Sequence, residues 1–108
     1  MAGRGLKPIV FLGDALDSLR AFPEAARKEA GVQLHKVQLG LPPSDWKPMP
    51  TVGLGAVEIR IHDKAGAFRV LFVAHRDDAV YVLHAFRKKT QRTAKHDLAL
   101  AAQRLKQI

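Results

Sequence analysis

The pattern of hydrophobic and polar residues divides the chain into strand-like and helix-like segments. Four segments, in which apolar residues alternate with polar ones or run together, are predicted to be strands: residues 7–12, 56–62, 67–75 and 79–88. In residues 14–22 and 23–39 the apolar residues recur every three or four positions instead, which predicts two helices joined at Pro23. A last helix is predicted in residues 94–108, with Thr93 as its N-terminal cap.

A proline-rich segment separates the second helix from the later strands. Residues 41–54, LPPSDWKPMPTVGL, contain four prolines and one glycine. Proline removes a backbone donor and fixes the backbone angle φ, so we predict a loop without regular structure. Its tryptophan, Trp46, either anchors the loop against the body of the protein or stacks on a nucleic-acid base. We favour the anchor.

The connections between the three later strands hold only a few residues each. Turns this short join antiparallel neighbours, so the three strands are predicted to form a meander. The predicted order is therefore β-α-α-β-β-β-α, an α+β fold in which helices pack on an antiparallel sheet. A chain of 108 residues has the length of one domain, which we expect to span residues 1–108.

The net charge indicates the kind of partner. Eighteen Lys and Arg against ten Asp and Glu give +8, and residues 55–108 hold eleven of these basic residues and five of the acidic ones. Six of the eight excess charges therefore lie with the three later strands and the last helix. Nucleic acid is the commonest partner of such a protein. A membrane surface is less suitable, since the basic residues are not confined to one face of an amphipathic helix.

Composition narrows the remaining function classes. The chain contains no cysteine, which excludes a disulfide framework and a thiolate metal site. The histidines lie on different predicted elements without an acidic cluster, so we predict neither a metal nor a cofactor. No apolar run reaches the ~20 residues of a membrane helix. The first residues, MAGRGLKP, lack the apolar core of a signal peptide. We expect a soluble, cytoplasmic protein.

The strand register predicts a group of polar side chains at one end of one face of the sheet. With the shortest turns, Arg60 lies opposite Arg69, and Arg69 lies opposite His84. Five residues then share that end of the face: Glu58, Arg60, Arg69, His84 and Lys88. The other end of that face is apolar, and the last helix is expected to pack on it. Its residues are Leu71, Val73, Val80 and Val82.

Two arginines directly opposite each other repel, and the sequence leaves two explanations. Either an anion lies between them, or Glu58 neutralises one of them in a surface ion-pair ladder worth ~0–1 kcal/mol. The first explanation suits RNA cleavage, in which a 2′-OH attacks the adjacent phosphate with the help of a base, an acid and cations. Arg60 and Arg69 suit the cationic role, and Glu58, His84 or Lys88 suit proton transfer. His84 is equally understandable as a buried core histidine.

The third strand of the meander continues into a basic segment. Cations held at the end of a rigid strand suit a phosphate backbone, although a solvated loop would also be rich in lysine. Four residues outside the predicted polar group are the expected RNA contacts: Arg87, Lys89, Arg92 and Lys95.

Several segments together resemble the RelE/HigB superfamily of toxins from bacterial toxin–antitoxin pairs, and within it the phage-derived Gp49-like branch. The segments span almost the whole chain: LRAFPEAARKEAG (19–31), VQLGLPPSDWKPM (37–49), GLGAVEIRI (53–61), FRVLFVA (68–74) and YVLHAFRKKTQRTAKHDLALAAQRL (81–105). Any one of these motifs alone is weak, but their combination in this order is quite specific.

The resemblance implies a RelE-like fold and a type II toxin that cuts messenger RNA, usually on the translating ribosome. It also implies a partner antitoxin, commonly a helix-turn-helix DNA-binding protein. Glu58 and Arg60 match paired polar positions of the family, Arg69 matches the arginine that holds the scissile phosphate, and Lys88 and Lys89 match a basic pair after the last strand. The last predicted helix offers His96 and Asp97 but no tyrosine, so the general acid and base stay unassigned.

Two other functions fit the same sequence. The first is a non-catalytic nucleic-acid-binding module of the same fold, which would bind RNA or DNA in a salt-dependent way without cleaving it. The second is a phage structural or accessory protein, which the high positive charge favours less.

Overall fold

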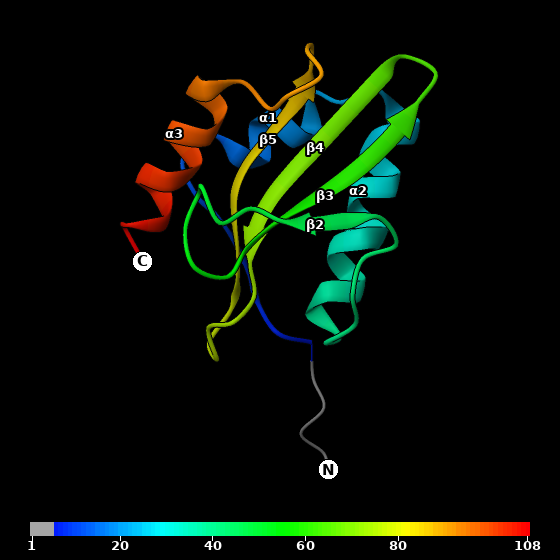
Figure 1. Ribbon diagram of the computed structural model, residues 1–108. Coiled ribbons are helices and arrows are strands. Elements are labelled where there is room, and N and C mark those ends of the chain that lie inside the picture. The colour runs from blue at the N-terminus through cyan, green and yellow to red at the C-terminus, as the bar shows by residue number, and fades with distance from the viewer. Residues whose placement is uncertain (1–5) are drawn as a thin grey trace.

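The computed structural model describes residues 6–108, in which three helices pack on one five-stranded sheet (Figure 1). The elements follow in the order β1 (Ile9–Phe11), α1 (Ala15–Arg20), α2 (Glu24–Gln38), β2 (Trp46–Pro48), β3 (Ala56–Asp63), β4 (Gly66–Val73), β5 (Val80–Lys88) and α3 (Lys95–Leu105). The strand order is β1-β5-β4-β3-β2, with β1 parallel to β5 and the other pairs antiparallel. Residues 1–5, the start of the basic N-terminal segment, lie outside the described residues.

The predicted α+β fold is confirmed, with one strand more than the sequence indicated. The prediction that residues 41–54 have no regular structure is wrong, because β2 pairs with β3. The backbone of Asp45 and of Met49 bonds to β3 on either side of Pro48. The missing N–H of Pro48 therefore belongs to the outer side of an edge strand, where proline removes no hydrogen bond of the sheet.

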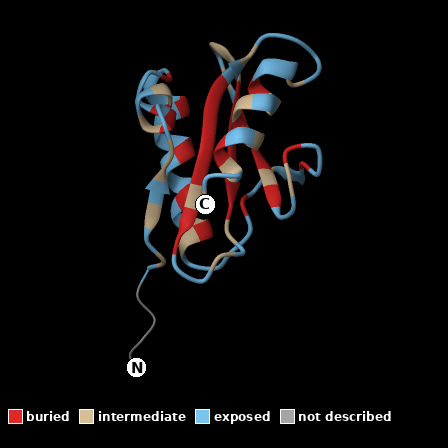
Figure 2. Ribbon diagram, turned by 90° about the vertical axis from the view of Figure 1, so that its left-hand side faces the viewer, coloured by how far each residue is buried: buried red, intermediate tan, exposed pale blue. Residues whose placement is uncertain are grey.

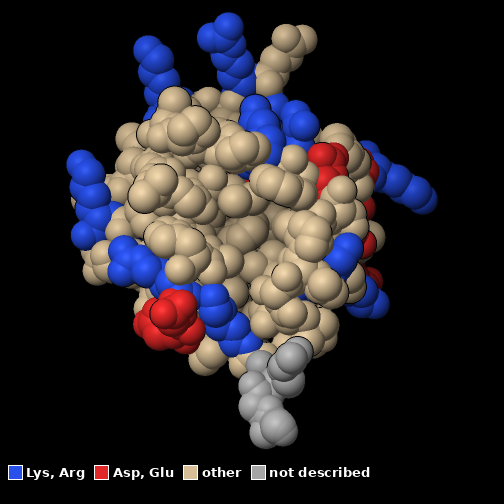
Figure 3. Space-filling view, turned by 60° about the horizontal axis from the view of Figure 1, so that its bottom comes forward, with Lys and Arg blue, Asp and Glu red and all other residues tan. Residues whose placement is uncertain are grey.

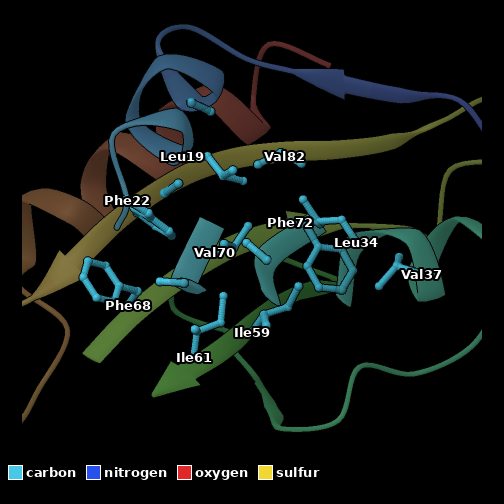
Figure 4. Packing of buried hydrophobic residues seen from close by; sticks show 14 of the residues in the cluster. Leu19, Phe22, Leu34, Val37, Ile59, Ile61, Phe68, Val70, Phe72 and Val82 are labelled. Carbon is cyan, nitrogen blue, oxygen red and sulfur yellow. The ribbon is translucent and has the colours of Figure 1, made fainter. Parts of the chain in front are cut away.

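Two hydrophobic clusters lie on opposite faces of the sheet. One face packs against α1 and α2, which lie behind the strands in Figure 1 and whose side chains are shown in Figure 4. The other face packs against α3 and the loop between β2 and β3, through residues that include Met49, Leu71, Leu83 and Ala101. Figure 2 shows buried strands between helices whose outer sides are exposed.

One predicted set of core residues is wrong for half of its members. Leu71 and Val73 do pack on the side of α3, but Val80 and Val82 pack with α1 and α2. The reason is a change of register: Val73 pairs with Tyr81, one residue later than predicted. A slip of one residue moves every following side chain to the other face of a strand.

One buried arginine helps to fix helix α3 to the rest of the fold. Arg104 donates from Nη1 to the carbonyl of Leu83 (2.9 Å) and from Nη2 to the carboxylate of Asp14 (2.6 Å). The guanidinium lies against Gly13, where a Cβ atom would come within 2.5 Å of Nη2 and where φ is +54°. A side chain at residue 13 would therefore displace the arginine that joins α3 to α1 and β5. None of the helices in residues 6–108 is long and apolar enough to cross a membrane.

Candidate functional site

The first hairpin of the meander places three of the predicted polar residues together. Arg60 lies opposite Arg69, as the sequence predicted, because the turn after Asp63 is as short as expected. Glu58 Oε1 lies 3.4 Å from Arg69 Nε. Both side chains are nearly inaccessible, since Glu58 is 1% and Arg69 is 4% exposed. The carboxylate therefore neutralises one of the two opposed arginines, but in a buried pair and not in a surface ladder.

The contact between Glu58 and Arg69 is ionic rather than a well-aligned hydrogen bond. Nε of Arg69 has no hydrogen-bond partner among the described residues, while its Nη1 donates to the carbonyl of Phe68 at 3.0 Å. Burial lowers the pKa of Arg69, and the carboxylate of Glu58 opposes that shift. Removing either partner would leave a buried, uncompensated charge, which typically costs about 3–5 kcal/mol.

The second oxygen of Glu58 joins the sheet to the segment before α3. Thr93 donates a hydrogen bond from Oγ1 to Oε2 of Glu58 at 2.8 Å. The prediction that Thr93 caps the last helix is wrong, since Ala94 is the N-cap of α3 and no side chain caps the helix end. The hydroxyl instead helps to satisfy a buried carboxylate, where an unpaired oxygen would cost more than an exposed helix end.

Arg60 differs from Arg69 in being partly exposed. Its side chain is 36% exposed, and Nη1 lies 4.0 Å from Oδ1 of Asp45. Asp45 also lies near His62, whose Nε2 is 3.4 Å from Oδ2. An ion pair of this length at the surface contributes ~0–1 kcal/mol, so Arg60 can exchange it for a phosphate at little cost.

Two lysines complete a cluster of cations around the buried pair. Burial lowers the pKa of Lys88, and the nearby charge of Arg69 lowers it further, with smaller effects from Arg60 and Lys47 and an opposite effect from Glu58. Lys47 pairs with Glu58 across β2 and β3 and is exposed. The structure therefore brings Glu58, Arg60, Arg69 and Lys88 together, as the sequence predicted.

Sequence reasoning missed Lys47 because its proline-rich segment was predicted to be a loop. The sequence did contain a signal for this strand. An edge strand tolerates proline, and the segment between Pro43 and Pro48 is long enough to hold most of a three-residue strand.

His84 lies apart from this cluster. The prediction that it faces Arg69 is wrong: Arg69 pairs with Phe86, and His84 pairs with Leu71, because the ladder between β4 and β5 has an irregularity at Leu71 and Phe72. An irregularity of this kind inserts a residue and re-aims the side chains that follow.

The imidazole of His84 is occupied in joining β5 to α3. Its Nε2 lies 2.7 Å from Oδ1 of Asp97, and its ring stacks on Phe86 with centroids 5.0 Å apart. Nδ1 is buried without a partner among the described residues. Neither ring nitrogen is free to reach a ligand in this arrangement. His84 therefore matches the buried-histidine interpretation better than the proton-transfer one.

A basic groove of about 780 Å³ runs along the exposed end of β5. Its walls are the corner between α1 and α2, the end of β5 and the start of α3. Six of the lining residues carry basic side chains: His84, Arg87, Lys88, Lys89, Arg92 and His96. Lys88 lines the groove and also belongs to the cluster around Glu58, so the two regions adjoin.

The four expected RNA contacts have different positions in this groove. Arg87, Lys89 and Arg92 line it, whereas Lys95 is exposed on the first turn of α3 and is not part of its wall. Arg87 is held in place, because its guanidinium lies 5.8 Å from the ring centroid of Phe68 and donates to the carbonyl of Ala65. Lys89 and Arg92 are exposed.

The arrangement is suited to holding phosphate groups. The groove offers several cations and one carboxylate, Asp97, which is already hydrogen-bonded to His84. Within residues 6–108, no three His, Cys, Asp or Glu side chains gather in a way that could hold a metal ion.

The comparison with protein families gives one result. Residues 17–106 match the family described as phage derived protein Gp49-like (DUF891). This range includes every residue of the cation cluster and of the groove. No curated protein matches the sequence.

Proposed function

The chain belongs to the Gp49-like family of phage-derived proteins, and from this premise we propose that it is the toxin of a type II toxin–antitoxin pair. The proposed activity is that of an endoribonuclease, which cuts messenger RNA on the ribosome and so inhibits translation. One observation carries the proposal: the solvent-accessible cations Lys47, Arg60 and Lys88 lie on β2, β3 and β5 around the buried pair, and Lys88 also lines the basic groove. Such a surface suits an RNA backbone bent across the sheet.

The proposed reaction needs no group beyond the RNA and the side chains. The 2′-oxygen attacks the adjacent phosphorus while its proton passes to a base, the P–O5′ bond breaks, and the leaving 5′-oxygen takes up a proton. The products are a 2′,3′-cyclic phosphate and a 5′-hydroxyl. Arg60 and Lys47 would stabilise the charge that builds on the phosphate. Arg69, which is buried, would act from beneath by holding Glu58 and the strands in register.

Lys88 is the strongest candidate for proton transfer among the residues predicted from the sequence. Its lowered pKa, caused first by burial and then by Arg69, increases the fraction that is uncharged near neutral pH. Glu58 is buried beneath the cations, and His84 has its Nδ1 buried and its Nε2 bonded to Asp97. We therefore assign these two residues a supporting role and not a direct one.

The proposed partners follow from the same reading. They are messenger RNA, the ribosome and a cognate antitoxin. In this family's relatives the antitoxin is commonly a helix-turn-helix DNA-binding protein. The proposed location is the cytoplasm. The proposed unit of function is one domain spanning the chain.

Induced expression in bacterial cells tests the proposal. Wild-type protein should arrest growth and create new messenger RNA ends that carry 2′,3′-cyclic phosphate, and Lys88→Met should abolish both. Lys28→Met is the matched control, because Lys28 is an exposed lysine on α2 that forms an ion pair with Glu24 and lies outside the groove. Soluble, folded wild-type protein that neither arrests growth nor cuts RNA would exclude the nuclease.

One observation favours a second candidate function, a non-catalytic nucleic-acid-binding module. Three of the five predicted catalytic residues, Glu58, Arg69 and His84, are more than nine-tenths buried. A binding module needs only the exposed cations. It would show salt-dependent RNA binding in the same preparations, without growth arrest and without new RNA ends.

A further inference from the structure

A second hollow lies at the opposite end of the strands from the basic groove, on the side of the sheet that packs against α1 and α2. It has a volume of about 470 Å³ and lies between the C-terminal end of α2, the following loop and the strands β2, β3 and β4. Its floor includes Val57 and Phe72, which belong to the core beneath α1 and α2. Trp46 lines it from β2, where it pairs with Ile59 of the same core.

The rim of this hollow exposes large apolar side chains. Leu39 and Leu41 are each 52% exposed and Trp46 is 44% exposed. Prolines 42 and 43 hold the loop that carries the two leucines next to the tryptophan. Each such side chain alone is unremarkable, but several around one concave surface are typical of a protein interaction site. Trp46 is thus only in part the buried anchor that the sequence favoured.

The charges around the hollow indicate what could fill it. Among residues 6–108, no Asp or Glu lines it, and Lys7 is the one charged residue in its wall. Nζ of Lys7 already donates to the carbonyls of Ala74 (2.8 Å) and Arg76 (2.6 Å), so it is fixed at the rim. Figure 3 shows this end of the molecule, where a hollowed surface of uncharged residues is surrounded by Lys and Arg side chains and by two smaller acidic patches, at the lower left and at the right. The surface therefore favours an apolar occupant that carries negative charge.

Two other occupants fit less well. A second copy of this chain would bring another net charge of +8 against the same basic rim. A nucleic acid could stack a base on Trp46, but its backbone carries one phosphate per nucleotide, and the described residues of the wall offer a single lysine. After its two bonds to carbonyls this lysine has one donor left, which suffices for one carboxylate of a peptide but not for a row of phosphates.

We propose that this hollow is a docking site for an acidic, amphipathic segment of a partner protein, which inserts a leucine or an aromatic side chain between Leu41 and Trp46. The surface is inferred from its own geometry and charge. Only the identification of the partner with the antitoxin rests on the proposed function. In that case the antitoxin binds at the end of the strands away from the basic groove and leaves the cations of the groove uncovered.

Selection from random peptides displayed on phage, against the purified full chain, tests the proposal. We expect enriched peptides that combine Asp or Glu with leucine or an aromatic residue and that bind saturably. Leu41→Glu should weaken the binding of the selected peptides at least about tenfold, as expected for a central contact. Leu54→Glu is the matched control, because Leu54 is 88% exposed outside the hollow and the variant has the same net charge.

The contrary outcomes are equally specific. Equal binding of the selected peptides to Leu41→Glu and Leu54→Glu would overturn the site, and Trp46→Ala supplies an independent check if the first variant is unfolded. Displacement of the peptides by single-stranded RNA, or a dimer in sedimentation that Leu41→Glu dissociates, would show that the occupant is nucleic acid or a second copy instead. The assay contains no ribosomes and no messenger RNA, so a failure of the nuclease proposal leaves its outcome unaffected.

Discussion

The buried pair Glu58–Arg69 and the basic groove along β5 hold similar residue types but use them differently. In the pair, a cation is nearly removed from water and depends on one carboxylate for compensation. In the groove, Lys89 and Arg92 are exposed and form no ion pair among the described residues. Buried charges govern stability, whereas exposed charges govern the attraction of ligands. Lys88 lies where the two regions meet.

The largest effect is expected for Arg69→Ala. This variant leaves the carboxylate of Glu58 buried without its cation, and we expect a loss of about 3–5 kcal/mol in the free energy of unfolding. Urea unfolding measured by circular dichroism tests this. The double variant Arg69→Met with Glu58→Leu should recover much of the loss, because it removes both charges. A loss below about 1 kcal/mol in the single variant would mean that Arg69 is not a structural residue.

Substitutions in the groove are expected to change RNA binding and its salt dependence, with little effect on stability. Arg92→Ser and Lys89→Ser should change the free energy of unfolding by no more than about 0.5 kcal/mol. Each should lower the slope of log K for single-stranded RNA against log salt concentration by about 0.7, the value for one phosphate contact. Fluorescence titration at several salt concentrations measures this slope. Lys28→Ser should leave it unchanged, and an equal change in all three variants would show that the groove is not the contact surface.

The smallest expected effect is on the pH dependence of the free energy of unfolding. The Arg104 guanidinium beside Asp14 holds the pKa of that carboxyl below its ordinary value of 3.8. A carboxyl whose pKa is lower in the folded than in the unfolded state stabilises the folded protein. This contribution has its full value at pH values above the unfolded-state pKa, and it is lost as the pH falls through the folded-state pKa. Asp14→Asn should therefore be less stable than the wild type at neutral pH, and the difference should shrink below about pH 3.8. A difference that is constant across the acid range would contradict this origin.

The sequence predicted those parts of the site that depend on local rules. The opposition of Arg60 and Arg69 followed from clean alternation and a short turn, and both were found. The position of His84 did not follow, because it depends on the irregularity in the ladder between β4 and β5. The alternation of residues along the sequence does not reveal such an irregularity.

The same limit explains the errors in the fold. β2 is three residues long and is held by pairing with β3, not by its own propensity. Thr93 has the composition of a helix cap, but a buried carboxylate in β3 takes its hydroxyl. Each error occurs where a contact with a residue distant in the sequence selects one of two structures that the local sequence allows.

The parallel pairing of β1 with β5 has a consequence for the kinetics of folding. Ile9 pairs with Val80, and Asp14 bonds to Arg104, so the first strand finds its partners only after most of the chain has been ordered. Closing loops of this length is a slow entropic step, and folds dominated by such pairings fold in about milliseconds to seconds. The β3–β4 hairpin, with its short turn, is the natural nucleus, and the outer strand β1 is expected to join the sheet late.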